Sequence, residues 1–523
     1  MAATATYGEY LRGRYGDRIG PGGRLNDYLG VRDGRLHFED LDLYATVRQY
    51  GSPLELVYTP LIERRVREMI ALFADARAAT GYRGGFVYAN ATKANVAEEV
   101  VRHALLAGAH QETSSTYDVD IARLLWRAGV LPPDRLVICN GFKVPSYADN
   151  IMALRREGYA NVLPVLDSPA EVDAFATLVL PLMVGLRQRI EAGVTTRAAL
   201  DRVESRFGMG FDELAAQADR LAGQPHLTLR LYHAMLGSQL DREEDWLASL
   251  FFAVECYCTL RERHPSLEYF DFGGGMPVAY SLDFSFDYAG FARRLLAGVK
   301  GVCARRGVPE PTIVGEFGRY TTAEHGAHLF RVVEEKPAGD GAAWYLVDSS
   351  LMVALPDSWG IGQKFIVLPL NGYDRPTRQV WLGGLTCDSD DVYREAGEPG
   401  YLTLPAADGE LYLGFFGTGA YQEMLSGVRG VHHCLLPEAK ELIVERDAAG
   451  EHRRVMHGQT SRNVLSVLGY GRYLGEHERL HAPGGLARST RIGGEDVHRR
   501  GAEGAENEGE DGRRIEDEGR RTN

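Results

Sequence analysis

From about residue 84 to residue 319, short apolar runs alternate with longer amphipathic segments. In one longer segment, Val96–Ala107, apolar residues recur every three or four positions and Gly108 stands where a helix would end. The short runs predict buried β-strands, at Gly84–Ala89, Ala109–Glu112, Leu136–Ile138, Asn161–Leu166, Pro181–Arg189, His226–Met235, Glu268–Phe272 and Thr312–Glu316. Eight strand–helix alternations favour an α/β fold, a (β/α)8 TIM barrel.

Beyond Tyr320 the pattern changes to short strands separated by Gly, Pro and Asp turns, with few helical segments. The predicted strands are Leu329–Glu334, Tyr345–Val347, Phe365–Leu368, Gln379–Leu382 and Leu411–Phe416. They indicate a separate C-terminal β domain of Greek-key or β-barrel type, which the N-terminal strands Arg35–Phe38 and Leu54–Tyr58 could join.

The domain organisation follows from these patterns, because 523 residues are too many for one ordinary core. From about Glu476 the chain is rich in Gly, Glu and Arg and poor in large apolar residues, which predicts disorder. We interpret this tail as a solvated extension rather than a partner-binding arm, since it offers no anchor residues. The predicted division is an N-terminal segment joining the β domain, the barrel, the β domain and the tail, at 1–60, 61–325, 326–475 and 476–523.

The composition, with 45% hydrophobic and 25% charged residues, is typical of a soluble globular protein. A formal net charge of −14 argues against a nucleic-acid partner. The longest apolar run, Ala174–Leu186, is too short to cross a bilayer, and residues 1–23 lack the apolar core of a signal peptide. The six cysteines are sparse and show no metal-type pairing, so we expect a cytoplasmic protein with no metal site, membrane or nucleic-acid partner.

Lys93 lies just past the first predicted barrel strand, in the stretch Tyr88–Asn95. A lysine there would project at the mouth of the barrel, where barrel enzymes place their chemistry. Partial burial would lower the pKa of its amine and so favour reaction with a carbonyl group. The alternative is a solvated loop lysine, which Lys93 taken alone does not exclude.

Three further patterns could carry chemistry. Gly273–Gly275 offers bare backbone amides to a phosphate, or makes only a tight turn. Glu316 and Arg319 follow the last barrel strand, where they could serve two ends of one cofactor or form a structural ion pair. Cys387, between a threonine and an aspartate, is either a proton donor or a small buried residue.

In order and spacing, these residues resemble the alanine-racemase-like, fold-type III pyridoxal-phosphate decarboxylases, over roughly residues 50–470. The resemblance implies that Lys93 covalently holds pyridoxal 5′-phosphate and that Glu316 faces its ring nitrogen. It implies that the phosphate is bound by Gly237, Ser238, Gln239, Gly273, Gly274, Gly275, Gly318, Arg319 and Tyr421. It also implies that Cys387, the proton donor, and Asp388 enter the active site of a second subunit, so that the chain forms a homodimer or a larger assembly.

Several stretches look specifically like biosynthetic arginine decarboxylases, namely Val137–Lys143, Ser205–Gly208, Leu355–Gln363, Leu385–Asp390 and Gly419–Glu423. The resemblance implies decarboxylation of L-arginine to agmatine and CO2 in polyamine and spermidine biosynthesis, and it adds Mg2+ as a candidate second cofactor. A guanidinium group needs a planar acceptor, which Asp357 or Asp388 supplies. A turn cap is the structural alternative for Asp357.

Two alternatives remain open. In the first, the substrate is ornithine, lysine, diaminopimelate or a carboxylated polyamine. In the second, the chain is a catalytically inactive regulatory homologue, which is disfavoured because it retains Lys93, Cys387, Glu316 and Arg319. The chain departs from the family at Met235, where a histidine usually stacks on the cofactor ring, and His233 lies two residues earlier on the same strand face.

Overall fold

The computed structural model describes residues 5–16, 23–190, 205–240, 242–428 and 430–475. The chain divides into two compact units, Met1–Thr460 and Ser461–Asn523. The barrel and the β-sheet both belong to the first unit, so the predicted domain boundaries at residues 60, 325 and 475 stay predictions. The tail predicted to be disordered, 476–523, lies outside the described residues.

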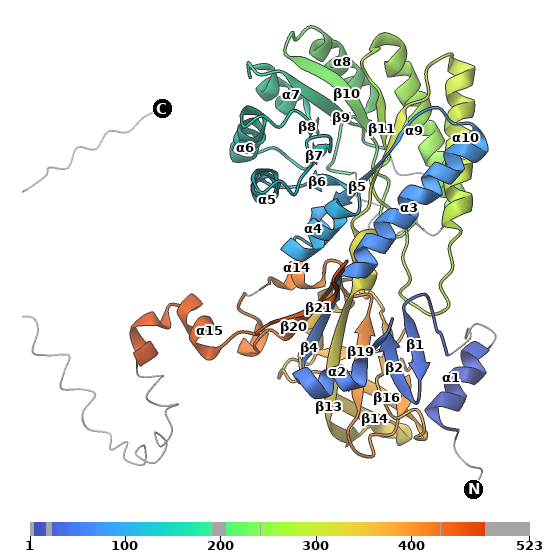
Figure 1. Cartoon of the computed structure of the whole chain (residues 1–523), viewed down its shortest axis with the longest axis vertical. Helices are drawn as coiled ribbons and strands as arrows, with labels where there is room; N and C mark the ends of the chain where they lie inside the picture. Colours follow the sequence, from blue (N-terminus) through green and yellow to red (C-terminus); the bar gives the residue numbers. More distant parts are fainter. Residues whose placement is uncertain (1–4, 17–22, 191–204, 241, 429, 476–523) are drawn as a thin grey trace, which may run out of the picture. The chain divides into compact units, whose positions relative to one another are not determined.

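Eight parallel strands close into a barrel, each pairing with the next and β12 pairing with β5 (Figure 1). The strands are β5 (Phe86–Ala91), β6 (His110–Thr113), β7 (Val137–Cys139), β8 (Val162–Leu166), β9 (Leu182–Arg187), β10 (Leu227–His233), β11 (Tyr269–Asp271) and β12 (Thr312–Glu316). Each overlaps a predicted strand, which confirms the (β/α)8 fold.

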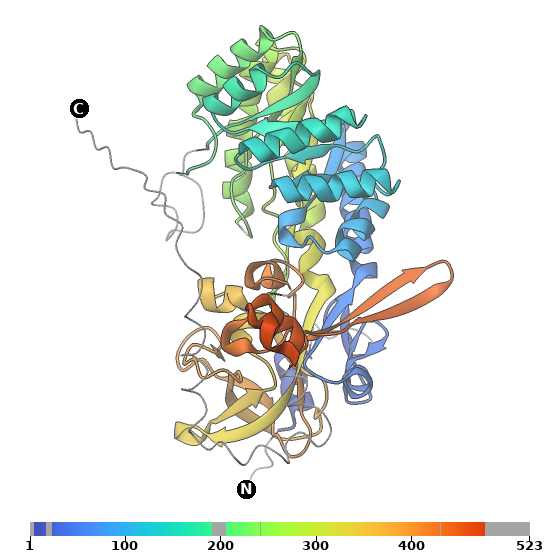
Figure 2. The same ribbon diagram turned by 90° about the vertical axis from the view of Figure 1, so that its left-hand side faces the viewer.

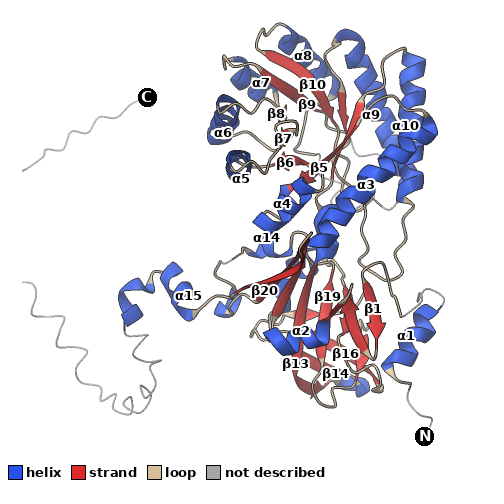
Figure 3. Ribbon diagram, viewed as in Figure 1, coloured by secondary structure: helices blue, strands red, loops and turns tan. Residues whose placement is uncertain are grey.

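The helices that precede and connect these strands surround the barrel (Figure 3). They are α3 (Thr59–Thr80), α4 (Glu98–Leu106), α5 (Thr116–Arg127), α6 (Pro145–Arg156), α7 (Pro169–Ala176), α8 (Phe211–Ala222), α9 (Glu243–Arg263) and α10 (Tyr288–Arg306). Serine caps explain where two of them begin, because Ser115 and Ser168 accept hydrogen bonds from the first turns of α5 and α7.

The barrel interior changes from apolar to polar along its axis. Apolar side chains from alternate positions of the strands fill it, namely Val87, Ala89, Leu136, Ile138, Leu163, Val165, Leu231 and Val314. At the carboxyl ends of the strands the buried residues are instead Glu112, Asn140, His233, Asp271 and Glu316. This polar layer lies at the end of the barrel where such folds place their active sites.

The predicted β domain is confirmed as a ten-stranded sheet. Its strands are β4 (Leu54–Tyr58), β13 (Gly326–Pro337), β14 (Ala343–Val347), β15 (Ile366–Pro369), β16 (Thr377–Gly383), β17 (Val392–Tyr393), β18 (Leu402–Pro405), β19 (Tyr412–Phe416), β20 (Lys440–Asp447) and β21 (Gly450–Met456). Beyond its pairing with β4, β20 continues into an exposed hairpin with β21 (Figure 2).

Of the two strands predicted in the N-terminal segment, only Leu54–Tyr58 joins the ten-stranded sheet. Strand β4, buried along its whole length, lies inside the sheet, antiparallel to β13 on one side and parallel to β20 on the other. The other predicted strand is β2 (Arg35–Phe38), which forms a separate three-stranded sheet with β1 (Leu29–Arg32) and β3 (Leu41–Asp42).

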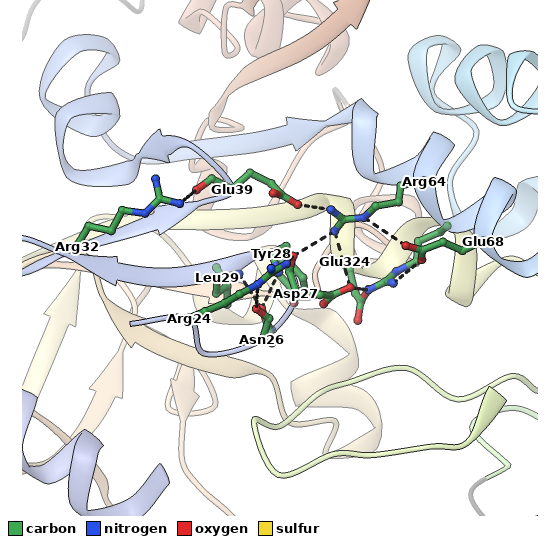
Figure 4. A network of polar contacts seen from close by, with 11 residues as sticks. Arg24, Asn26, Asp27, Tyr28, Leu29, Arg32, Glu39, Arg64, Glu68 and Glu324 are labelled. Carbon is green, nitrogen blue, oxygen red and sulfur yellow. Dashed lines mark hydrogen bonds and ion pairs between the residues drawn. The ribbon is translucent and has the colours of Figure 1, made fainter. Parts of the chain in front are cut away.

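An ion-pair network joins this N-terminal segment to α3 and to the 3-10 helix η3 (Ala323–His325) (Figure 4). Arg64 pairs with Glu39 at 2.5 Å. Arg65 pairs with Asp27 at 2.6 Å and donates from Nε to the buried carboxylate of Glu324 at 2.7 Å. Because η3 directly follows α11 (Arg319–Thr322), the network holds the segment that carries one of the predicted site residues.

Shorter helices complete the first unit, namely α1 (Tyr7–Tyr15), α2 (Leu43–Tyr50), α12 (Leu351–Ala354), α13 (Pro356–Ile361) and α14 (Gln422–Ser426). The second unit contains α15 (Ser461–Val467) and the 3-10 helix η6 (Tyr470–Tyr473). Among the described residues, no helix is long and apolar enough to cross a membrane.

Candidate active site

A cavity lies at the carboxyl end of the barrel strands. It is lined by Ala91, Lys93, Met235, Ser238, Gly274, Gly275, Met276, Glu316, Phe317, Gly318, Arg319, Tyr320 and Tyr421. Larger hollows lie beside α1 and beside α4, but their walls lack the glycine turns and the lysine at a barrel strand end. The fold thus gathers most of the predicted cofactor-binding residues around one space.

Lys93 enters this cavity from the end of β5. The 3-10 helix η2 (Thr92–Ala94) turns the chain there, and both neighbours of Lys93 are buried. Thr92 donates from its hydroxyl to the carbonyl of Glu112 at 2.8 Å, and the carbonyl of Ala94 accepts from the Tyr421 N–H at 2.8 Å. The backbone is therefore anchored on both sides of the lysine, while its own side chain remains accessible from the cavity.

The charge on Lys93 is governed by Glu112, fully buried at the end of β6. Glu112 raises the pKa of Lys93, and this attraction outweighs burial of the amine, which acts in the opposite direction. The sequence-based expectation of a lowered pKa is therefore wrong for the free amine. Burial raises the pKa of Glu112 to about 7, against the attraction of Lys93. The electrostatic attraction between Lys93 and Glu112 consequently depends on pH near neutrality.

Asn140, just after β7, joins the two buried carboxylates of the site. Its Nδ2 donates to Glu112 Oε1 at 3.0 Å and to Glu316 Oε1 at 2.7 Å, which uses both amide hydrogens. His233 Nε2 lies 3.4 Å from Glu316 Oε2. Burial alone would raise the pKa of Glu316, but His233, Lys93 and Asn140 outweigh it and lower the pKa to about 2. Glu316 is therefore ionised, as a partner of a protonated ring nitrogen must be.

The glycines let the chain segments around the cavity approach one another more closely than a side chain would allow. A Cβ on Gly274 would lie 2.9 Å from the Glu316 carbonyl oxygen, and one on Gly318 would lie 2.9 Å from the Ala94 Cβ. Gly275 adopts a φ of +108° that side chains rarely allow. Gly273 does not line the cavity; its N–H and carbonyl hold the turn instead, bonded to the Asp271 carboxylate and the Glu316 N–H at 2.8 Å each.

Arg319 presents a cation to the cavity. Its Nη1 donates to the Tyr280 hydroxyl at 2.6 Å, and its guanidinium lies over the Tyr421 ring, 4.6 Å from the centroid. Among the described residues, its buried Nε has no hydrogen-bond partner. An unpartnered donor beside glycine turns fits an anion such as a phosphate.

Asp357 lies against Arg319, in the first turn of α13. Its Oδ2 is 3.9 Å from Arg319 Nη1 and accepts from Gln422 Nε2 at 3.1 Å. Helix α13 has no side-chain cap hydrogen bond, so the turn-cap alternative finds no support. The structure instead places a buried carboxylate beside a residue that lines the cavity.

Cys387 and Asp388 do not line the cavity of their own chain. They lie in the loop between β16 and β17, where Cys387 is exposed, so the interpretation of Cys387 as a small buried residue is wrong. Asp388 Oδ2 lies 3.5 Å from His433 Nε2. Their predicted role therefore depends on a second copy of the chain.

The departure at Met235 has a structural consequence. Met235 lines the cavity, and its Sδ accepts from the Gly274 N–H at 3.1 Å. His233 is fully buried, pairs with Glu316 and does not line the cavity, so it does not replace the usual ring-stacking histidine. Gln239 likewise bonds the backbone of Val278, at 2.9 and 3.2 Å, rather than lining the cavity.

Two groups of potential metal ligands occur among the described residues. Of the first group, His233, Asp271 and Glu316, only Glu316 lines the cavity described above, and the other two stand at the ends of β10 and β11. The other group is Glu55, Glu423 and Glu441, whose oxygen atoms lie within 4.8 Å of one another. Burial and the neighbouring Glu423 carboxyl raise the pKa of Glu55. Acidic clusters are common without an ion, so the candidate Mg2+ stays a prediction.

Three residues of the site, Glu112, Asn140 and Tyr280, were not predicted from the sequence. A usable signal existed for the first two, because each stands at the carboxyl end of a predicted barrel strand. Tyr280 lies in a loop between β11 and α10, and its hydrogen bond to Arg319 has no counterpart in the sequence pattern.

Comparisons with known proteins agree with this geometry. Residues 62–323 match the family model described as pyridoxal-dependent decarboxylase, pyridoxal binding domain. The chain is 25% identical to the biosynthetic arginine decarboxylase of Thermosynechococcus vestitus, over 86% of each chain, and 25% identical to that of Yersinia pestis, over 84% of each.

Solved structures show the same fold. The biosynthetic arginine decarboxylase of Campylobacter jejuni superposes with a TM-score of 0.72 at 20% identity, covering 91% of this chain and 95% of that one. The diaminopimelate decarboxylase of M. jannaschii, in complex with L-lysine, gives a TM-score of 0.71 at 19% identity, covering 84% and 98%.

The barrel and the family match together define an enzyme whose cofactor is pyridoxal 5′-phosphate and which removes carboxyl groups from amino acids. The chain belongs to the pyridoxal-dependent decarboxylase family, whose pyridoxal-binding domain its barrel forms.

Proposed function

We propose that the chain decarboxylates L-arginine to agmatine and CO2, as a step of polyamine biosynthesis. The names of curated relatives that match most of the chain support this substrate. The observation that carries the proposal is the buried carboxylate of Asp357 beside Arg319. A carboxylate suits the planar cation of a guanidinium, whereas it would repel the distal carboxylate of diaminopimelate.

The residues around the cofactor ring would have separate roles. When bound through Lys93, pyridoxal phosphate supplies an electron sink for the electrons left as CO2 departs. Glu316, ionised and fixed by Asn140 and His233, would hold a proton on the ring nitrogen. Glu112 accepts the other amide hydrogen of Asn140, and its charge acts on Lys93.

At the other end of the site, Arg319 and the backbone of Gly274, Gly275 and Gly318 would bind the phosphate, with Ser238 beside them. Tyr421 would join them, and its ring already orients Arg319 by stacking. Gly273 would act through the conformation of the turn.

We infer further that the working enzyme is a homodimer or a larger assembly in the cytoplasm. A proton donor must reach the substrate α-carbon, and Cys387 does not reach the cavity of its own chain. A second copy would supply Cys387, with Asp388 as an additional partner for the substrate. The sparse, unpaired cysteines suit a reducing compartment.

The substrate assignment is tested by CO2 release from arginine, ornithine, lysine and diaminopimelate, with the wild type and Asp357→Asn. We expect arginine to be preferred. The variant should lose about 10- to 100-fold in kcat/KM for arginine, since a hydrogen bond to a charged group contributes about 1.5–3 kcal/mol, while the visible absorbance of the bound cofactor is retained. Release of CO2 from diaminopimelate alone would refute the assignment.

The shared active site is tested by mixing two inactive variants, Lys93→Ala and Cys387→Ala. Each hybrid dimer contains one intact site, so random reassociation should restore about a quarter of the wild-type activity. Lys93→Ala alone should also lack the visible absorbance of the bound cofactor. Absence of any recovery after verified subunit exchange would exclude a shared site.

A further inference from the structure

Two exposed thiols face each other outside the cavity. Cys387 Sγ lies 3.7 Å from Cys434 Sγ, and both residues are exposed. The other four cysteines of the chain are buried. A pair of accessible thiols at this distance needs only a small movement to reach the roughly 2 Å of a disulfide bond.

The two loops that carry these thiols are held in place. Thr386, next to Cys387, bonds the Asp391 carboxylate through its N–H at 3.1 Å and its hydroxyl at 2.7 Å. A second contact joins the loops, since His433 Nε2 lies 3.5 Å from Asp388 Oδ2. The approach of the thiols is therefore a property of two anchored loops rather than of one free side chain.

Cys434 also has a backbone conformation that its residue type does not favour. Its φ is +54°, and the following Leu435 has a φ of +54° as well. Such left-handed residues that are not glycine are uncommon and tend to occur where function requires them. Here the conformation turns the 3-10 helix η5 (His433–Leu435) so that Cys434 meets Cys387.

We propose that Cys387 and Cys434 form a reversible intrachain disulfide when the protein meets a peroxide. One thiolate attacks a peroxide oxygen to give a sulfenic acid and one water; the second thiol then attacks that sulfur and releases the second water. The two sulfurs together lose two electrons, which reduce one hydrogen peroxide to two waters. A dithiol reductant reverses the bond by thiol–disulfide exchange.

The consequence for activity rests on the proposed function, in which Cys387 is the proton donor. The disulfide removes its hydrogen and ties its loop to η5, so the oxidised protein cannot deliver a proton to the substrate. The structure favours a disulfide over a metal site for these two thiols, because Cys387 and Cys434 belong to neither group of potential metal ligands among the described residues.

The test uses the holoenzyme, treated with hydrogen peroxide, then alkylated and digested for peptide mass mapping. We expect a Cys387–Cys434 cross-linked peptide that dithiothreitol removes. Cys434→Ser, which lies outside the cavity, should retain basal activity and form no cross-link. The buried Cys258–Cys303 pair, with sulfurs 4.0 Å apart, is an internal control that should stay reduced.

Four outcomes decide between the possibilities. Persistence of both thiols at peroxide doses that inactivate the enzyme would overturn the proposal, as would a cross-link that joins two subunits on a non-reducing gel. A Cys387–Cys434 cross-link with parallel loss and recovery of decarboxylation supports both the disulfide and the proton-donor role. The same cross-link with undiminished activity supports the disulfide and refutes the proton-donor role.

Discussion

Asn140→Ala removes the amide that joins Glu112 to Glu316, and its effect follows from the geometry. The bond to Glu316 is 2.7 Å long and ends on an ionised, buried carboxylate. A hydrogen bond to a charged group contributes about 1.5–3 kcal/mol. At about 1.4 kcal/mol per pKa unit, its loss should raise the pKa of Glu316 by about 1–2.

The pH dependence of stability distinguishes this mechanism from simple loss of packing. The folded-state pKa of Glu316, about 2, lies below its ordinary value, so the ionised form stabilises the folded chain at neutral pH. That contribution is lost as the pH falls through the folded-state pKa. The variant should therefore unfold with a deficit of about 1.5–3 kcal/mol at pH 7, and the deficit should shrink as the pH falls toward 2.

Urea unfolding between pH 3 and 8, with and without added pyridoxal phosphate, measures this deficit. The matched control is Asn161→Ala, whose amide bonds the Pro133 carbonyl at 2.8 Å and lies outside the cavity. The variant should also bind the cofactor more weakly than the control does. An equal deficit at every pH, or none at pH 7, would contradict the role assigned to Asn140.

Three further predictions concern single side chains. Met235→His should free the Gly274 N–H for the phosphate and lower the Kd for pyridoxal phosphate by about tenfold, for one charge-assisted hydrogen bond, as measured by absorbance titration. Arg319→Lys should raise the same Kd by about 10- to 100-fold, because lysine offers neither the planar fork nor the stacking surface; an unchanged Kd would contradict its role. Arg65→Met should cost about 3–5 kcal/mol in urea unfolding by leaving the buried Glu324 without its cation. Adding Glu324→Gln should recover part of that loss, and no recovery would argue against the ion pair.

The barrel could be predicted from the sequence because parallel strands buried on both faces appear as continuous apolar runs. Strand β8, buried at all five positions, is an example. The hairpin of β20 and β21 was missed because β21 is mainly exposed and charged, with no apolar alternation to indicate a strand. The place of β20 in the sheet is set by its pairing with β4, which is far away in the chain.

Some residues of the candidate site could likewise be predicted from the sequence, and others could not. Lys93, Glu316 and Arg319 could be found because each stands at or just after the carboxyl end of a predicted barrel strand, and the closed barrel brings those ends together. Asn140 also stands near the end of a predicted strand, but its role was missed because its two partners stand 28 and 176 residues away in the chain. The pKa of Lys93 was predicted in the wrong direction because the attraction of Glu112 depends on how two strand ends meet.

The position of β4 has a consequence for biosynthesis. This strand emerges from the ribosome before any strand of the barrel, yet both of its neighbours, β13 and β20, are made only after the barrel is complete. Its two hydrogen-bonding edges stay without their native partners throughout that interval, and exposed strand edges promote association with other chains. The nascent protein is therefore most vulnerable while its catalytic barrel is already forming, and fragments that stop before Lys440 should require chaperones to remain in solution.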